Sequence, residues 1–254
     1  MWGVKHSCLP LVLALFLLVI GHTVAGAAPV LLIDQGHDQR FVVEKDGPLH
    51  LSGFAGVLKE EGVDVRVGTA PLTAQSLAGV DALLISGPFA KLQADEIDAV
   101  MAFLARGGRL ALMLHIPSPL ADLVHRLDTD FTNYVLSEQE NVIDGDQRNF
   151  RVRNFTSHPL FGSMDSFSLY GGWALMNTGD RAAIIASTSD KGWVDLDGDR
   201  KLTKGDVVQA FGVVVEGTSG AGRYLIFGDD AIFQNKFLDD KNRQLARNLA
   251  RWLK

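Results

Sequence analysis

The chain has 254 residues, of which 47% are hydrophobic, and its formal net charge at pH 7 is −6. This hydrophobic content excludes a disordered or fibrous protein, and the length suits one large α/β domain or two small ones. A nucleic-acid-binding surface needs clustered lysines and arginines. The sequence contains no basic run, so we expect no nucleic-acid partner.

Residues 1–27 have the order of a secretory signal peptide. Lys5 precedes an apolar run from Cys8 to Gly21, and small residues follow at Ala25, Gly26 and Ala27. The apolar run is shorter than the roughly 20 residues that a membrane span needs, so an uncleaved anchor is the weaker interpretation. We expect cleavage after Ala27 and a periplasmic or secreted mature protein.

Cys8 is the only cysteine of the chain, and it would be removed with the signal peptide. It begins the apolar run instead of following it, so lipoprotein attachment is not expected. A mature chain without a thiol forms no disulfide, and it has neither a cysteine nucleophile nor a thiolate metal ligand.

Apolar runs bounded by turn residues predict the elements of the first half of the chain. The expected strands cover 29–33, 63–67, 81–86 and 109–116, and the expected helices cover 52–61 and the region around 97–104. Alternation of strands and helices is typical of a doubly wound, mostly parallel sheet, because parallel neighbours need a crossover connection. We therefore predict one α/β domain of the flavodoxin-like type over residues 28–254.

The second half of the chain is less regular. Residues 117–180 contain many polar and turn-forming residues, and we predict an excursion of short strands and loops there. The sheet pattern then resumes with strands at 182–186, 208–215 and 223–227. Asp239 or Asp240 can cap a last helix, and one apolar face of that helix would dock on the sheet.

Residues 195–206 have the spacing of a calcium loop. Carboxylates stand at the first, third, fifth and twelfth positions, a backbone carbonyl is available at the seventh, and a hydroxyl lies near the ninth. The expected ligands are Asp195, Asp197, Asp199, Lys201, Thr203 and Asp206. Calcium takes roughly six to eight oxygen ligands, which such a loop can supply. The alternative is an acidic surface turn that is only solvated.

The loop resembles the dockerin type of EF-hand loop, with aspartate at its last position and Gly198 at its fourth. Arg200 departs from the pattern, since the sixth position normally holds glycine for a left-handed turn. Strand-like segments, and not helices, flank the loop. We therefore expect calcium to stabilise the fold and not to act as a sensor switch.

Polar residues follow several of the predicted strands. In open α/β sheets ligands bind at the carboxyl ends of the strands, so these residues are candidates for a ligand-binding crevice. The candidates are Asp34, Gln35, His37, Ser86, His115, Asp229, Asp230 and Asn235. Such a crevice can hold a metal, support acid–base chemistry or bind a hydroxyl-rich ligand.

Within the crevice, His37, His115, Asp34 and Asp229 are the catalytic candidates. The alternative is that the aspartates cap turns or helix starts and that the histidines are satisfied buried groups. Trp173, Trp193 and Tyr170 could stack on sugar rings, although aromatic residues near turns often pack against the protein itself.

Five segments carry a resemblance to a known family: 30–37, 81–88, 106–110, the His-Pro-Leu-Phe-Gly segment at 158–162, and the Gly-Asp-Asp turn at 228–230. Together they resemble class I glutamine amidotransferase-like domains of the non-amidotransferase branch. That branch includes gliding-motility, intraflagellar-transport and trehalose-utilisation type domains and exported bacterial domains of unknown function. The resemblance implies an amidotransferase-like three-layer sandwich.

The sequence departs from true amidotransferases at the decisive position. After the strand that starts at Arg109, where those enzymes carry a cysteine nucleophile on a tight turn, this chain has His115-Ile116-Pro117. Without a cysteine in the mature chain, glutamine hydrolysis through a thiolate is excluded. The sequence also lacks a nucleophile elbow, a zinc-protease motif, a phosphate-binding loop and a dinucleotide fingerprint.

The leading hypothesis is therefore an exported, non-catalytic ligand-binding or interaction domain that is stabilised by calcium. Its ligand would be a small polar molecule, and only the family resemblance suggests a carbohydrate. One alternative is a hydrolase in which His37 or His115 acts as the base. Another is an accessory subunit of an envelope or transport complex, with its interface in residues 117–180.

Overall fold

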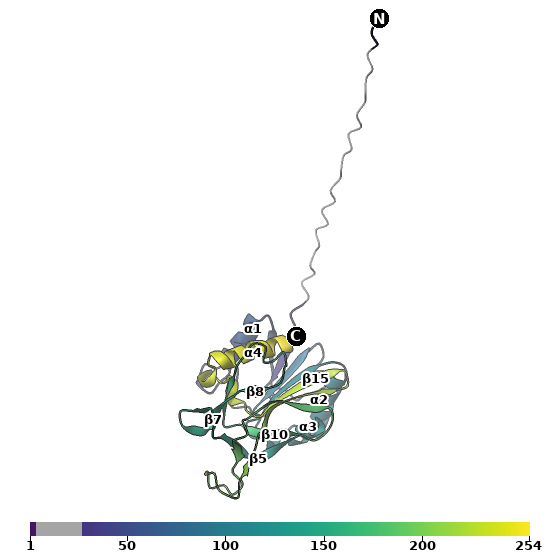
Figure 1. The fold of residues 1–254 in the computed structure, drawn as a ribbon. Coiled ribbons are helices and arrows are strands. Elements are labelled where there is room, and N and C mark those ends of the chain that lie inside the picture. Colours follow the sequence, from purple (N-terminus) through teal and green to yellow (C-terminus); the bar gives the residue numbers. More distant parts are fainter. Residues whose placement is uncertain (4–26) are drawn as a thin grey trace.

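A computed structural model describes residues 1–3 and 27–254 of the chain, and the predicted apolar signal segment lies outside these residues. Across the described part, no helix has both the length and the hydropathy needed to cross a membrane. The described chain forms a mixed α/β fold built around one large sheet (Figure 1).

One half of the large sheet is parallel. Its strands lie in the order β2-β1-β3-β4-β15, which is the order that a flavodoxin-like sheet requires. They are β1 (Val30–Asp34), β2 (Asp64–Gly68), β3 (Ala82–Ser86), β4 (Arg109–Met113) and β15 (Gly222–Phe227). β1, β3 and β4 are apolar and buried almost throughout because the sheet is covered on both faces.

Helices cover both faces of this parallel half (Figure 1). On one face lie α1 (Ser52–Glu60) and α4 (Asp240–Trp252), and on the other lie α2 (Ala94–Ala105) and α3 (Ala121–Arg126). Alternate residues of each strand enter the two cores: Leu84 packs with the α1 and α4 side, and Leu83 with the α2 side. The Asp239 carboxylate caps α4 by accepting the Asn242 N–H at 2.8 Å, as predicted.

The other half of the sheet is antiparallel, so the prediction of a mostly parallel sheet is wrong for this half. Beyond β15 the order is β14-β10-β5-β12-β13, and each of these pairs is antiparallel. The strands are β14 (Gly212–Ser219), β10 (Trp173–Asn177), β5 (Thr129–Glu138), β12 (Gly192–Val194) and β13 (Val207–Val208). Two more, β11 (Ala182–Ser187) and β8 (Asn154–Phe155), extend from β14.

Residues 117–180 are more regular than predicted. They contain a short 3-10 turn, η1 (Ser118–Leu120), the helix α3, and the strands β5 and β10 of the main sheet. They also form a three-stranded antiparallel sheet of β6 (Val142–Ile143), β7 (Asp146–Val152) and β9 (Phe167–Tyr170). The ten-residue strand β5 mixes polar and apolar residues, because an antiparallel strand can leave part of its surface in water.

Two further boundaries differ from the prediction. β4 ends at Met113 and not at Ile116, since the chain turns there toward η1. The predicted strand 208–215 is divided between β13 and β14. Gly212 begins β14 where an added Cβ would lie 2.7 Å from the Leu175 carbonyl oxygen, so the close crossing of β10 and β14 requires glycine at this point.

Candidate functional site

The first candidate group, Asp34 and His37, is closed by a third residue that the sequence did not reveal. His37 Nδ1 lies 2.8 Å from Asp34 Oδ2, and His37 Nε2 lies 3.0 Å from Glu96 Oε1. All three residues are buried. The Asp34 hydrogen bond raises the pKa of His37 against the opposing effect of burial, and both carboxylates add to the rise.

Glu96 joins this group to the start of α2. Its carboxylate accepts the backbone N–H groups of Gln93 at 2.8 Å and Leu72 at 2.9 Å. Burial raises the pKa of Glu96, but these N–H donors and His37 outweigh it and hold the pKa below its usual value. Both ring nitrogens of His37 are therefore engaged in holding β1 to α2, and neither is available to act as a base.

Three other candidates lie apart from this group, and two of them are held by side-chain hydrogen bonds. The Gln35 amide donates to Glu44 at 2.9 Å and fastens the loop after β1. The Asn235 Oδ1 accepts the Gly53 N–H at 2.8 Å, at the start of α1. Ser86 is buried at the end of β3, before a turn at Gly87. The structure thus does not bring all eight predicted residues into one crevice.

The second candidate group is a histidine–aspartate pair with an open side. His115 Nδ1 lies 3.0 Å from Asp230 Oδ1, and the His115 side chain is 34% exposed while that of Asp230 is buried. The ring of His115 also lies against the rings of Phe41 and Phe89. The Asp230 hydrogen bond raises the pKa of His115, and burial opposes the rise.

Asp229 lies next to this pair but faces the backbone. Its carboxylate accepts the Tyr170 N–H at 2.6 Å and the Ala231 N–H at 2.7 Å. Burial, and then the neighbouring charge of Asp230, raises the pKa of Asp229 to about 8 in spite of these donors. Asp229 therefore holds β9 to the turn after β15, as the structural interpretation of this residue predicts.

The acidic loop connects two short strands, β12 and β13, which pair Val194 with Val207. Carboxylate oxygens of Asp195, Asp197 and Asp199 lie within 4.8 Å of one another. Asp195 also accepts the backbone N–H of Gly198 at 2.7 Å and of Arg200 at 2.8 Å. Their oxygens are hard donors of the kind that calcium prefers, so these three side chains fit the ion.

The closing positions of the loop are also ordered by hydrogen bonds. Asp206 accepts the N–H of Leu196 at 2.9 Å and of Thr203 at 2.6 Å, and the Thr203 hydroxyl donates to Asp197 at 3.3 Å. The backbone N–H of Lys201 donates to Asp199 at 2.8 Å. Arg200 has a φ angle of 63°, the left-handed conformation that the sixth position of such a loop requires.

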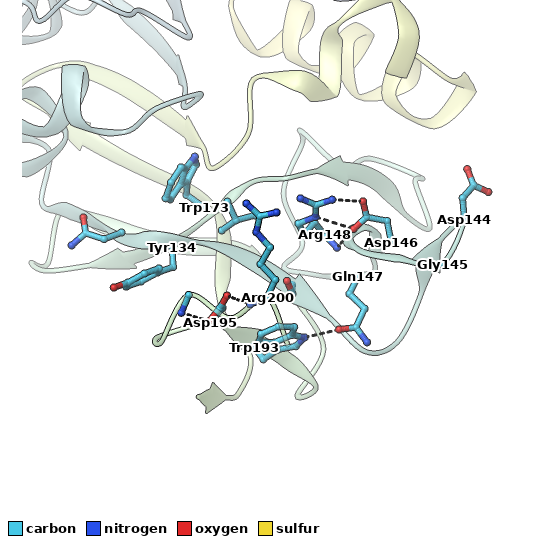
Figure 2. A pocket seen from close by; sticks show the side chains of 14 residues that line it. Tyr134, Asp144, Gly145, Asp146, Gln147, Arg148, Trp173, Trp193, Asp195 and Arg200 are labelled. Carbon is cyan, nitrogen blue, oxygen red and sulfur yellow. Dashed lines mark hydrogen bonds and ion pairs between the residues drawn. The ribbon is translucent and has the colours of Figure 1, made fainter. Parts of the chain in front are cut away.

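A groove with a volume of about 780 Å³ lies beside this loop (Figure 2). Its walls come from β5, the β6–β7 turn, the start of β10, β12 and the acidic loop. The chemically distinctive lining residues are Asn133, Tyr134, Asp146, Gln147, Arg148, Trp173, Trp193, Asp195 and Arg200. The β6–β7 turn has positive φ at both Asp144 and Gly145, the geometry of a tight hairpin turn.

Trp173 connects the groove to the histidine–aspartate pair. It is half-buried, and its indole N–H donates to the His115 carbonyl oxygen at 2.8 Å. Trp193 is buried and donates to the Gln147 side chain at 3.2 Å, as Figure 2 shows. Tyr170 instead stacks on Phe237 with 4.1 Å between ring centroids, so it packs against the protein.

Sequence reasoning missed Glu96 and most of the groove. Glu96 is 59 residues from His37 in the chain, and only its capping position at the start of α2 marks it. Tyr134, Gln147 and Arg148 lie on strands inside the region that was predicted to be irregular. No periodic pattern in β5 or β7 could have placed them together, because Gln147 and Arg148 are consecutive in the strand and the burial of β5 does not alternate.

Fold comparison places the chain in a class of α/β domains. The N-terminal domain of mmIFT52 has a TM-score of 0.70 at 15% identity and aligns over 88% of this chain and 96% of its own. The cytoplasmic protein STM1381 from Salmonella typhimurium LT2 has a TM-score of 0.58 at 15% identity, with 89% and 99% covered. A ThuA-like protein from Parabacteroides merdae ATCC 43184 has a TM-score of 0.51 at 11% identity, with 89% of each chain covered.

The expected family resemblance is thus confirmed at the level of the fold, which is ThuA-like or amidotransferase-like. The chain belongs to the family described as Domain of unknown function (DUF4350), whose model matches residues 45–250. No curated protein shows significant sequence similarity to this chain.

Proposed function

We propose that this protein is an exported, non-catalytic ligand-binding domain of the class I glutamine amidotransferase-like superfamily, with a calcium ion that stabilises its binding surface. Export rests on the signal-like order of residues 1–27, with cleavage after Ala27 and a periplasmic or secreted destination. The one observation that carries the binding role is the groove beside the acidic loop.

The groove supports binding because it combines aromatic faces with polar groups. Its volume of about 780 Å³ is in the range of small-molecule sites, which commonly combine apolar and aromatic walls with a few placed polar groups. Tyr134 is exposed and Trp173 is half-buried, and amide and guanidinium groups also line the groove. The His115 end of the predicted crevice adjoins it through Trp173.

The non-catalytic role rests on how the other candidates are used. His37 is held between two carboxylates, and the Asp229 carboxylate accepts two backbone N–H groups. A catalytic base needs a ring nitrogen within reach of a substrate proton, which His37 cannot offer in this arrangement. The chain after Ala27 also has no cysteine nucleophile.

Calcium is proposed as a structural partner of the loop at residues 195–206. Asp195, Asp197 and Asp199 would supply carboxylate oxygens, with Lys201 (carbonyl), Thr203 and Asp206 as the remaining predicted ligands. Bound calcium would hold the ends of β12 and β13 together beside the groove. An ion bound only by the folded state stabilises it by about 2.7 kcal/mol at a concentration 100 times its Kd.

The test is thermal unfolding of the purified chain in excess calcium and in excess EGTA, with metal content measured by elemental mass spectrometry. We expect calcium to raise the melting temperature of the native protein by several degrees and Asp197→Asn to abolish that rise. Asp144→Asn, which removes an exposed carboxylate from the neighbouring hairpin turn, should keep the rise. Equal melting temperatures with and without calcium would mean that the loop is only a solvated turn.

A hydrolase is the second candidate, because His115 is paired with a buried aspartate and its Nε2 side is partly open. In that reading Asp230 orients the ring and Nε2 takes a proton from water or substrate. The discriminating assay is turnover of nitrophenyl esters and glycosides by native protein and by His115→Gln. Turnover that disappears in the variant would favour the hydrolase, whereas our proposal expects none that depends on His115.

The role of an accessory subunit in an envelope or transport complex stays a prediction. It would require a protein partner bound by residues 117–180, which include β5, β7 and β10. The proposed groove occupies part of the same surface. A protein partner that displaced ligand from the groove would support both the accessory-subunit hypothesis and the ligand-binding proposal.

A further inference from the structure

We propose that the groove is specific for a saccharide that carries a carboxylate, such as a uronic-acid oligosaccharide, and that Arg200 is the residue that recognises the carboxylate. The inference rests on the proposed binding function and names its ligand class.

Arg200 occupies a position at which glycine is the natural choice. Its φ of 63° places a residue with a Cβ in the left-handed region, which glycine adopts more easily. The Asp195 carboxylate fixes this conformation by accepting the Arg200 backbone N–H at 2.8 Å. The loop requires this conformation whatever residue stands there, so what an arginine adds at this position is its side chain.

The Arg200 side chain is directed into the groove. Figure 2 shows its guanidinium rising from the loop to the level of Trp173 and Arg148. Among the residues that the structure describes, the Arg200 guanidinium has no hydrogen-bond or ion-pair partner, and only its backbone N–H is engaged. An arginine held in this way presents a planar set of donors that matches a carboxylate.

The other cation of the groove is already paired with a carboxylate. Arg148 pairs with Asp146 through two hydrogen bonds of 3.0 and 2.8 Å, and Asp195 accepts two backbone N–H groups. Asp144 lies at the outer turn, away from the centre of the groove in Figure 2. The positive charge of Arg200 is thus the one that an incoming anion would meet inside the groove.

The walls around Arg200 suit a sugar ring better than an extended peptide. Tyr134 offers an exposed aromatic face and Trp173 a half-buried one. Asn133 and Gln147 supply planar amides that can both donate to and accept from hydroxyl groups. The groove thus offers three kinds of contact to such a sugar. The aromatic faces suit the apolar side of a pyranose, the amides suit its hydroxyl groups, and the arginine suits its carboxylate.

The experiment compares trigalacturonate with its methyl ester, which has the same sugar skeleton but no negative charge. Binding to the full chain is followed by tryptophan fluorescence and calorimetry, with calcium kept only slightly above the protein concentration, so that the loop can hold its proposed ion and the sugar is not bridged by free calcium. We expect trigalacturonate to bind at least about tenfold more tightly than the ester, a difference of about 1.4 kcal/mol. Arg200→Met should remove that preference.

The controls separate Arg200 from general charge and from folding. Arg66→Met removes an exposed arginine from β2, on the opposite edge of the sheet, and should leave both affinities unchanged. Arg200→Gly, which suits the local φ, should lose the preference while remaining folded by circular dichroism. Tyr134→Ala should weaken both sugars, because it removes an aromatic face and no charge.

Three outcomes would overturn the inference. Equal binding of sugar and ester would make the groove a neutral-saccharide site, in which case the proposed binding function stands and the ligand class falls. Binding of poly-glutamate that is as tight and as dependent on Arg200 would show an acidic-peptide site. No binding of any of the three probes would reject the ligand class, while the calcium test decides separately on the proposed structural ion.

Discussion

The two halves of the large sheet use their polar residues in different ways. In the parallel half, the polar side chains at the strand ends bind to one another or to the backbone, as His37, Asp34 and Glu96 do. In the antiparallel half, residues such as Tyr134 and Arg200 are exposed beside an open groove. The parallel half therefore satisfies these polar groups internally, whereas the antiparallel half leaves polar and aromatic groups open to solvent.

The difference follows from how each half is covered. Helices pack on both faces of β1, β3 and β4, so polar groups that enter this region must be satisfied internally. Antiparallel strands such as β5 and β7 have exposed positions along their length. A surface that is not covered by helices can carry aromatic and charged side chains without a desolvation cost, and a ligand can reach them.

The largest expected effect comes from breaking the buried charge cluster of the parallel half. His37→Asn would leave the carboxylates of Asp34 and Glu96 buried without a cation, and breaking a buried pair in this way costs about 3–5 kcal/mol. Urea unfolding followed by far-ultraviolet circular dichroism measures the loss. His125→Asn is the control, since His125 pairs with Asp130 at the surface and should contribute less than about 1 kcal/mol.

If His37→Asn proved as mild as His125→Asn, the polar groups of the parallel half would not be structural, and the contrast between the halves would fail. His37 would then again be a candidate for catalysis. The same variant, where it stays folded, should bind groove ligands with native affinity, because His37 is not among the residues that line the groove.

The second prediction tests whether the three-stranded sheet of β6, β7 and β9 is held to the parallel half of the large sheet through α4. Asn242 of α4 is fully buried, accepts the Ser168 N–H at 2.8 Å and donates to the Ser168 carbonyl oxygen at 3.1 Å. Asn242→Ala leaves these groups of β9 unsatisfied, and we expect a loss of about 2–3 kcal/mol. Hydrogen exchange should show reduced protection in both α4 and β9.

The control for this variant is Asn177→Ala, at an exposed position of β10, which should change stability by less than about 0.5 kcal/mol. Loss of protection confined to β9, with α4 unchanged, would mean that the three-stranded sheet opens independently of the parallel half. The molecule would then have three regions that differ in stability: the parallel half, the antiparallel half and the three-stranded sheet.

A smaller effect is the pH dependence of stability. The pKa of His37 is raised above 6.5 in the folded state, mainly by the Asp34 hydrogen bond. Its contribution is therefore complete below about pH 6.5 and is lost as the pH rises through the folded pKa, at about 1.4 kcal/mol for each unit of the rise. Asp229, whose pKa burial raises from 3.8 to about 8, acts in the same direction, because stability falls between these two pH values, where the carboxyl keeps its proton in the folded state and loses it in the unfolded state.

Urea midpoints measured between pH 5.5 and 9 should therefore fall as the pH increases. His37→Asn should remove the part of the fall that begins near pH 6.5 and leave the part due to Asp229, which is already present at pH 5.5 and levels off above about pH 8. A native protein whose stability is constant or rises over this range would show that His37 and Asp229 keep their ordinary pKa values and that the cluster is not a charged one.

The sequence predicted the parallel half well and the antiparallel half poorly, for one physical reason. Strands such as β3, with the sequence Ala-Leu-Leu-Ile-Ser, are buried on both faces and form continuous apolar runs. β5 contains Asp130, Asn133 and Tyr134 among apolar residues, and the same composition is common in loops. Its strand character depends on β10 and β12, its neighbours in the sheet, which no local pattern reveals.

The candidate sites also differ in how much of each could be predicted from the sequence. The acidic residues at 195–199 are close in sequence, so spacing alone could place three carboxylates together. The His37–Glu96 contact joins the loop after β1 to α2. It forms only when α2 packs against that loop, so residue spacing alone could not predict it. The groove draws on several separate segments, so its lining could not be assembled before the antiparallel pairings were known.

The last prediction has the smallest expected effect, and it tests whether the arginine at position 200 lowers the stability of the loop. Glycine in place of alanine usually destabilises a protein by about 0.5–1 kcal/mol, but at a positive φ the preference reverses. Because Arg200 has a φ of 63°, Arg200→Gly should be about 1 kcal/mol more stable than Arg200→Ala, measured in EGTA by urea unfolding. A glycine variant that is less stable than the alanine variant would contradict the left-handed conformation. The expected gain would mean that the loop retains an arginine at a cost in stability, as the proposed recognition of a carboxylate by its guanidinium requires.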